Sequence, residues 1–153
     1  MPQRGSPTFT STSTSRTPPR TAASSVSGES IATEIQAGSY ALMDTAYAKL
    51  DGPFVPALWI AATVISVNPR FAVADCGLKA LGMDHGNPDV DGARVWFCSD
   101  EHVTFAPETP LRAGDRVRVW PAHVDPTVAY HERLHIVSGE DVLDVWPVDL
   151  RGW

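Results

Sequence analysis

The chain has 153 residues, of which 43% are hydrophobic and 20% charged, and its formal net charge at pH 7 is −6. This length suits one domain with or without a tail, and the composition excludes collagen and a coiled coil. The acidic balance argues against nucleic acid as a partner, because its phosphates require clustered Lys and Arg. The apolar stretch 57–67 is too short to span a membrane. Cys76 and Cys98 make no disulfide framework and are predicted to be inert core thiols, so we expect a cytoplasmic protein with one core.

Residues 1–30 differ in composition from the rest of the chain. Ser, Thr and Pro supply 18 of these 30 residues, and three arginines with one glutamate give a charge of +2, whereas residues 31–153 carry −8. Such a segment cannot bury enough apolar surface to offset its ordering entropy, so a disordered tail is expected over 1–30. An arginine-containing start rich in Ser and Thr also resembles a transit peptide, although no amphipathic apolar face accompanies it.

From residue 31 onward, short apolar runs alternate with turn residues. The runs are rich in Val, Ile, Trp, Phe and Thr, which favour strands. The predicted strands are Tyr40–Met43, Leu58–Val67, Phe71–Asp75, Val95–Cys98, Val103–Phe105, Arg116–Trp120, Leu134–Val137 and Val142–Val148. Thr45–Leu50 and Gly77–Met83 are the candidate helical turns, and Ser138–Asp141 predicts a hairpin. About eight short strands at this spacing predict a mainly β domain over 31–153, a small closed or partly open β-barrel.

The polar segment that stands out is Pro121–Thr127. It follows the predicted strand that ends at Trp120, and in extended backbone residues i and i+2 point to the same side. His123 and Asp125 can therefore converge, and an imidazole with a carboxylate is half of a coordination shell for Zn²⁺ or Mn²⁺. A surface turn with an Asp-Pro bend explains the same residues, because a His-x-Asp spacing is common by chance.

Four further residues are weaker candidates for a catalytic pocket: Asp75, Glu101, His102 and Thr127. Asp75 ends a predicted strand, where its carboxylate could point into a pocket or cap a turn. Glu101 and His102 could form an acid/base pair, but adjacent residues of a strand face opposite ways. The signatures of phosphate-binding loops, nucleophile elbows and metalloproteases are absent from the sequence.

Several segments occur in a specific order along the chain. They are Thr33–Tyr40 with Met43 and Asp44, Ala74–Leu81, Ser99–His102, Gly114–Val117, Pro121–Val128 and Asp144–Pro147. This series resembles the C-terminal β-domain of the D-threonine aldolase and D-serine dehydratase family. Members of this family are pyridoxal-phosphate enzymes of the alanine-racemase-like fold type. The resemblance covers about residues 31–153.

The resemblance implies a function for the polar segment. In the family, a PxHx[CD] motif of the β-domain supplies a divalent metal site, which makes His123 and Asp125 the metal ligands here. The metal would act as a Lewis acid on an oxygen of a D-amino acid. Pyridoxal phosphate would be held by a lysine of an N-terminal barrel, and the β-domains would lie at the interface of a homodimer.

Two features of the chain depart from the family pattern. Ala129 stands where we expect Asn, and the two lysines, Lys49 and Lys79, do not match the lysine that binds pyridoxal phosphate. The sequence therefore predicts the metal-carrying domain of a lyase, inactive without a catalytic barrel, and leaves open whether the chain alone is an enzyme. The alternatives are a non-catalytic dimerisation or binding module, and a metalloenzyme that adds His102 or Glu101 to the two ligands.

Overall fold

The computed structural model describes residues 38–50, 52–149 and 151. The predicted tail over 1–30 lies outside these residues, and so do residues 31–37 of the predicted β-domain. Within the described part of the chain, no helix has the length and apolar character needed to cross a membrane.

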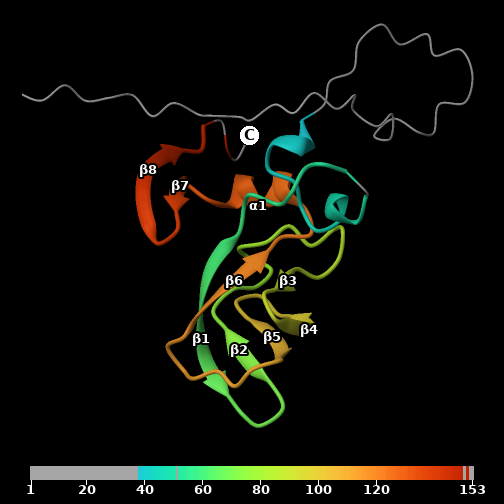
Figure 1. Cartoon of the computed structure of the whole chain (residues 1–153), viewed down its shortest axis with the longest axis vertical. Helices are drawn as coiled ribbons and strands as arrows, with labels where there is room; N and C mark the ends of the chain where they lie inside the picture. The colour runs from blue at the N-terminus through green and yellow to red at the C-terminus, as the bar shows by residue number, and fades with distance from the viewer. Residues whose placement is uncertain (1–37, 51, 150, 152–153) are drawn as a thin grey trace, which may run out of the picture. The chain divides into compact units, whose positions relative to one another are not determined.

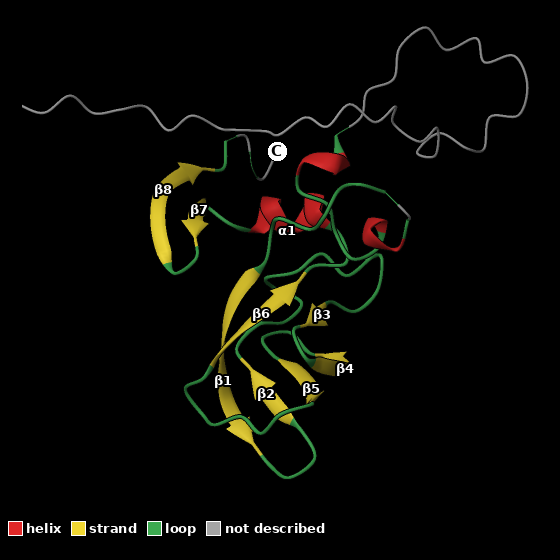
Figure 2. Ribbon diagram, in the orientation of Figure 1, coloured by secondary structure: helices red, strands yellow, loops and turns green. Residues whose placement is uncertain are grey.

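Six strands form a closed barrel (Figures 1 and 2). They are β1 (Ile60–Val67), β2 (Ala72–Ala74), β3 (Asp89–Val90), β4 (Ala93–Cys98), β5 (Val103–Pro107) and β6 (Arg116–Trp120). The order around the barrel is β1-β2-β5-β4-β3-β6, and every neighbouring pair is antiparallel. The pairing of β1 with β6 closes the barrel, which leaves none of these strands as a free edge.

The core fills the inside of this barrel. Along β1 the buried residues Ala62 and Val64 alternate with more exposed neighbours, as a strand with one inward face requires. Phe105 of β5 has no exposed surface, and its neighbour across the sheet is the small residue Ala72. A barrel of so few strands has a narrow interior, so large and small side chains must alternate to fill it.

The remaining elements lie outside the barrel sheet. Strands β7 (Arg133–Ser138) and β8 (Asp141–Pro147) form a separate two-stranded sheet, joined by a turn in which Gly139 has a φ of +61°. The predicted hairpin is thus present. Helix α1 (Val124–Tyr130) lies at one end of the barrel, where β6 ends (Figure 1). Two 3-10 turns, η1 (Ser39–Ala41) and η2 (Tyr47–Lys49), precede β1.

The predicted fold class is confirmed, because the described part of the chain is mainly β, with a closed barrel and eight strands in all. The predicted strand Tyr40–Met43 is wrong. The N–H of Met43 donates to the carbonyl of Ser39 (2.8 Å), and Met43 has a φ of +52°, so the chain turns tightly there. An apolar pattern of four residues cannot distinguish such a turn from a strand.

The segment Gly77–Met83 is a loop rather than a helix. One turn forms at its start, but the N–H groups of Leu78 and Lys79 donate to the carbonyls of Ser99 and Asp100, both at 2.9 Å. These bonds to a distant segment replace the bonds that would continue a helix. Local propensity contains no information about such a partner.

Burial governs the acidity of Cys76. Burial, with smaller effects of Cys98 and Asp75, raises the pKa of the Cys76 thiol from 9.0 to about 12. An unfolded chain would release this proton near pH 9, whereas the folded chain retains it. The contribution to stability is therefore complete below pH 9 and is lost between pH 9 and 12.

We accordingly expect the free energy of unfolding to fall as pH rises above 9, by up to about 1.4 kcal/mol per pH unit from this thiol. Denaturant titrations of the wild type and Cys76→Ala between pH 8 and 10.5 measure this loss. At pH 8 the variant should be less stable than the wild type, because the substitution leaves a cavity. Between pH 8 and 10.5, however, its free energy of unfolding should fall less than that of the wild type. Parallel pH curves for the two proteins would contradict the assignment.

Candidate metal centre

His123 is placed by the end of a barrel strand. After β6, the buried residues Pro121 and Ala122 lead directly to His123, whose backbone is extended with a φ of −142° and a ψ of 119°. Its backbone pairs with Gly82 through an isolated β-bridge. The histidine is therefore anchored to the barrel on one side and to a loop on the other.

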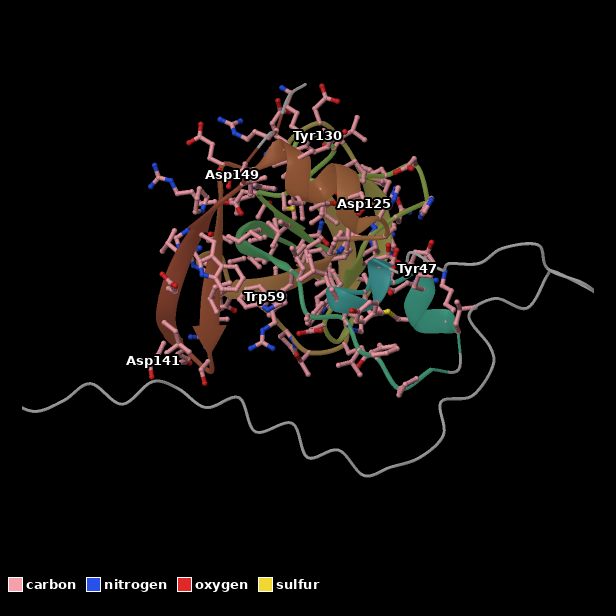
Figure 3. All side chains as sticks on the ribbon, turned by 90° about the horizontal axis from the view of Figure 1, so that it is seen from above. Tyr47, Trp59, Asp125, Tyr130, Asp141 and Asp149 are labelled. Carbon is pink, nitrogen blue, oxygen red and sulfur yellow. The ribbon has the colours of Figure 1, made fainter. Side chains whose placement is uncertain are left out.

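Asp125 lies on a helix rather than on extended backbone. Helix α1 begins at Val124, so Asp125 belongs to its first turn, and Figure 3 shows Asp125 and Tyr130 on this helix. The predicted extended segment is wrong from Val124 onward. A proline is tolerated in a first helical turn, which explains how Pro126 fits α1. The two predicted ligands nevertheless lie close together, with 3.4 Å between His123 Nε2 and Asp125 Oδ2.

Thr127 holds this corner of the protein together. Its side chain is completely buried, and its hydroxyl accepts a hydrogen bond from the N–H of Gly82 (2.9 Å) and donates one to the carbonyl of His123 (2.6 Å). A side chain at Gly82 would collide with Pro126 and would come within 3.1 Å of the His123 carbonyl oxygen. Thr127 and Gly82 therefore fix the backbone of His123.

Asp84 orients the imidazole of His123. The two oxygens of its carboxylate lie 2.7 and 2.9 Å from His123 Nδ1. Partial desolvation raises the pKa of Asp84. The hydrogen bond from His123, a backbone hydrogen bond and the charges of His123 and His85 lower this pKa by a larger amount, so the net shift is downward. An ionised carboxylate only accepts hydrogen bonds, so Nδ1 carries the proton. In the neutral imidazole the lone pair is then on Nε2, which faces Asp125.

His85 lies against one face of the same imidazole. Its ring stacks on that of His123, with 3.9 Å between the ring centroids and 9° between the planes. Ligand atoms of Asp84, His85 and His123 all lie within 4.8 Å of one another. Sequence reasoning missed Asp84 and His85, because 39 residues separate Asp84 from His123. The available signal was the Asp-His pair in a loop bounded by Gly82 and Pro88.

An open pocket of about 510 Å³ adjoins His123 and Asp84. Its other lining residues are Leu78, Leu81, Met83, Pro126 and Tyr130. The lining thus combines apolar side chains with the imidazole of His123 and the carboxylate of Asp84. This is the usual composition of a small-molecule site.

The other three predicted pocket residues lie elsewhere. Asp75 is exposed, and its carboxylate accepts a hydrogen bond from the N–H of Thr63 (2.5 Å) beside the irregularity in β1. Glu101 forms an ion pair with Lys79 on the surface, which lowers the pKa of Glu101. The carbonyl of His102 accepts a hydrogen bond in a tight turn. None of them lines the pocket beside His123.

Asp44 is a buried carboxylate that binds the backbone next to His123. It is 2% exposed, and it accepts hydrogen bonds from the N–H groups of Tyr47 (2.8 Å) and Val124 (3.4 Å). It thereby joins η2 to the start of α1. The carbonyl of Pro121 also accepts a hydrogen bond from the N–H of Thr45 (3.1 Å). The segment before β1 therefore positions the residues on both sides of His123.

A protein-family model described as "Putative serine dehydratase domain" matches residues 57–137. The chain belongs to this family, which is the C-terminal domain of fold-type III pyridoxal-phosphate enzymes. The resemblance inferred from the sequence is thus confirmed.

Two enzymes and one solved structure show the relation in detail. The chain is 38% identical over 140 residues to a 3-hydroxy-D-aspartate aldolase of Paracoccus denitrificans, covering 82% of this chain and 36% of that protein. It is 37% identical over 132 residues to a D-threonine aldolase of an Arthrobacter species, covering 79% of this chain and 35% of that protein. The D-threonine aldolase structure from Filomicrobium marinum superposes with a TM-score of 0.68 at 36% identity, covering 75% of this chain and 35% of that protein. The chain spans about a third of the length of these relatives.

We expect the hydroxyl of Thr127 to contribute more to the free energy of unfolding than its methyl group does. Thr127→Val keeps the shape but leaves the buried N–H of Gly82 without an acceptor, which should lower the free energy of unfolding by about 1–3 kcal/mol. Thr127→Ser keeps both hydrogen bonds and serves as the matched control. Denaturant unfolding measures both variants, and a Thr127→Val protein as stable as Thr127→Ser would refute this role.

Proposed function

We propose that this chain is the metal-carrying domain of a pyridoxal-phosphate-dependent lyase that acts on D-amino acids. The ligands are His123 Nε2 and the Asp125 carboxylate, and the metal is Zn²⁺ or Mn²⁺. The observation that supports this best is the pairing of His123 Nδ1 with Asp84. A carboxylate on one imidazole nitrogen fixes the tautomer and the orientation that the other nitrogen needs to bind a metal.

The donor groups suit such an ion. A neutral imidazole and a carboxylate are ligands that both Zn²⁺ and Mn²⁺ accept. Asp125 is 81% exposed at its side chain and His123 is 20% exposed, so the site is open on the Asp125 side. A metal held there would supply Lewis-acid polarisation of a substrate oxygen. Asp84 would keep the imidazole in place while substrate exchanges at the open positions.

The described residues do not fit pyridoxal phosphate itself. A lysine that forms a Schiff base must lose its proton, and burial usually promotes that loss. Lys79 is exposed, and its hydrogen bond and ion pair with Glu101 raise its pKa. Lys49 is exposed in η2, away from the pocket beside His123. The cofactor therefore belongs to the part of the relatives that this chain does not match.

The named activities of the relatives define the proposed substrate class. One is a 3-hydroxy-D-aspartate aldolase and another a D-threonine aldolase. Both names denote D-amino acids with a hydroxyl on the β-carbon, and that hydroxyl is an oxygen that a metal beside His123 could polarise. Cleavage of the Cα–Cβ bond and elimination of water are both reactions of this class. Alone, without a catalytic barrel, the chain would carry out neither.

Metal binding by the isolated chain tests the assignment. We expect His123→Ala to abolish Mn²⁺ binding and Asp125→Asn to weaken it at least about tenfold, because each removes one of two protein ligands. Isothermal titration of protein without a histidine tag measures the affinities. His135→Ala, an exposed histidine on β7, is the matched control and should bind as wild type. Unchanged Mn²⁺ binding by His123→Ala would refute the proposal.

A second candidate function is a non-catalytic dimerisation module, and the hairpin favours it. Val142, Leu143 and Trp146 of β8 are between 53% and 66% exposed. A two-stranded sheet is marginally stable alone, and exposed apolar patches mark contact surfaces. The resemblance implies a homodimer, so the partner we assign to these exposed apolar residues is a second copy of the chain.

Sedimentation velocity tests this second function. Dimerisation through β8 predicts that the wild type sediments as a dimer and that Leu143→Glu sediments as a folded monomer, because a buried unpaired charge opposes the contact. Glu140→Lys, in the turn beside β8, controls for a change of charge alone. A monomeric wild type would rule out dimerisation and would leave the proposal for His123 and Asp125 intact.

A further inference from the structure

We propose that Asp84, His85 and His123 form a second metal site, on the Nδ1 side of the His123 ring. It lies on the opposite edge of the imidazole from Asp125, and it takes a nitrogen-preferring divalent ion such as Zn²⁺. The inference depends on the proposed function only because both sites use His123. Its ligand set is a separate one, and so is its choice of metal.

The donors already gather around one atom. Asp84 Oδ2 lies 2.7 Å from His123 Nδ1 and 3.8 Å from His85 Nε2. Ligands bound to Zn²⁺ at about 2.0–2.2 Å in a tetrahedron stand roughly 3.5 Å apart. The observed cluster has all three ligand atoms within 4.8 Å, but the lone pairs of two stacked rings do not converge on one point. Binding therefore requires the His85 ring to turn out of its stack on His123. In the bound state the His123 imidazole would take its other tautomer, with the proton on Nε2 instead of Nδ1, and Asp84 would change from a hydrogen-bond acceptor to a ligand.

The backbone that carries these residues is held on both sides. The N–H of Gly86 donates to the carbonyl of Met83 (3.1 Å), which closes a tight turn around Asp84 and His85. Gly86 has a φ of +116°, a conformation that favours glycine. On the other side, Gly82 is bound to His123 through the isolated bridge and to Thr127 through its N–H. The ligands are thus brought together before any ion binds.

The position of His85 is consistent with a ligand. Its side chain is 39% exposed, so an ion can reach it and can keep a water in the fourth position. Among the described residues, its polar partner is Asp84, and its ring stacks on that of His123. Both residues belong to this cluster, so no other part of the fold accounts for its orientation.

The two sites should differ in how strongly they discriminate between Zn²⁺ and Mn²⁺, because their donors differ. Two imidazoles with one carboxylate favour Zn²⁺ over Mn²⁺, whereas one imidazole with exposed carboxylate and water oxygens accepts Mn²⁺. Zn²⁺ at the second site occupies His123 Nδ1 and withdraws Asp84 from its orienting role. Excess Zn²⁺ would therefore compete with Mn²⁺ bound through Nε2 of the same ring.

Titration of the untagged full chain with each metal separately tests this site. We expect His85→Ala to weaken Zn²⁺ binding at least about tenfold and to leave Mn²⁺ binding within about twofold. Asp125→Asn should give the opposite pattern, with Mn²⁺ weakened and Zn²⁺ retained. His135→Ala is the control for a histidine outside the cluster and should match the wild type for both ions.

Nitrogen-15 NMR of the histidine side chains identifies the ring nitrogen that binds. Zn²⁺ should shift His123 Nδ1 and a nitrogen of His85, and Mn²⁺ should broaden the His123 signals with or without His85. Unchanged Zn²⁺ affinity in His85→Ala overturns the second site, even if Mn²⁺ still requires His123 and Asp125. If Asp125→Asn leaves Mn²⁺ unaffected while His85→Ala loses Zn²⁺, the proposed function fails and the second site stands.

Discussion

The arrangement of the candidate centre depends on one close contact, between the loop at Gly82 and the start of α1. The Thr127 hydroxyl bonds to both backbones, and the absence of a side chain at Gly82 allows them to approach. This contact brings Asp84 and His85 to His123, although they are far apart in the sequence. A hydrogen bond in a dry environment is costly to lose, so the contact holds the loop firmly. The closed barrel supplies the rigid base for it.

The imidazole of His123 has two edges with different surroundings. On one edge an ionised Asp84 accepts from Nδ1, and on the other the exposed Asp125 lies beside Nε2. The low pKa of Asp84 keeps its carboxylate ionised near neutral pH, where it can hold either the Nδ1 proton or a metal. In the two sites that we propose, the same residue thus orients one metal ligand or becomes another. Which role it takes depends on the ion, because the donor atoms on the two edges differ in kind.

Sequence patterns predict the parts of this protein that obey a local rule. The strand over Arg116–Trp120 alternates polar and apolar residues and forms β6 as expected. The hairpin after Val137 follows from its turn residues. Helix α1 escapes prediction, because Pro126 and Asp125 within seven residues resemble a turn. The role of Asp84 could not be predicted because its partner lies in a different segment. No spacing rule connects a loop with the end of a distant strand.

The sequence by itself determined the β class of the domain, its family and the pair His123 and Asp125 as candidate ligands, because alternation and short motifs are local properties. Only the tertiary structure decided that Asp84 faces His123 Nδ1, that His85 stacks on the same ring, and that Thr127 supports the loop instead of lining the pocket. These relations arise from closing the barrel, which places the loop after β2 against the segment after β6. The order of residues along the chain does not reveal these distances.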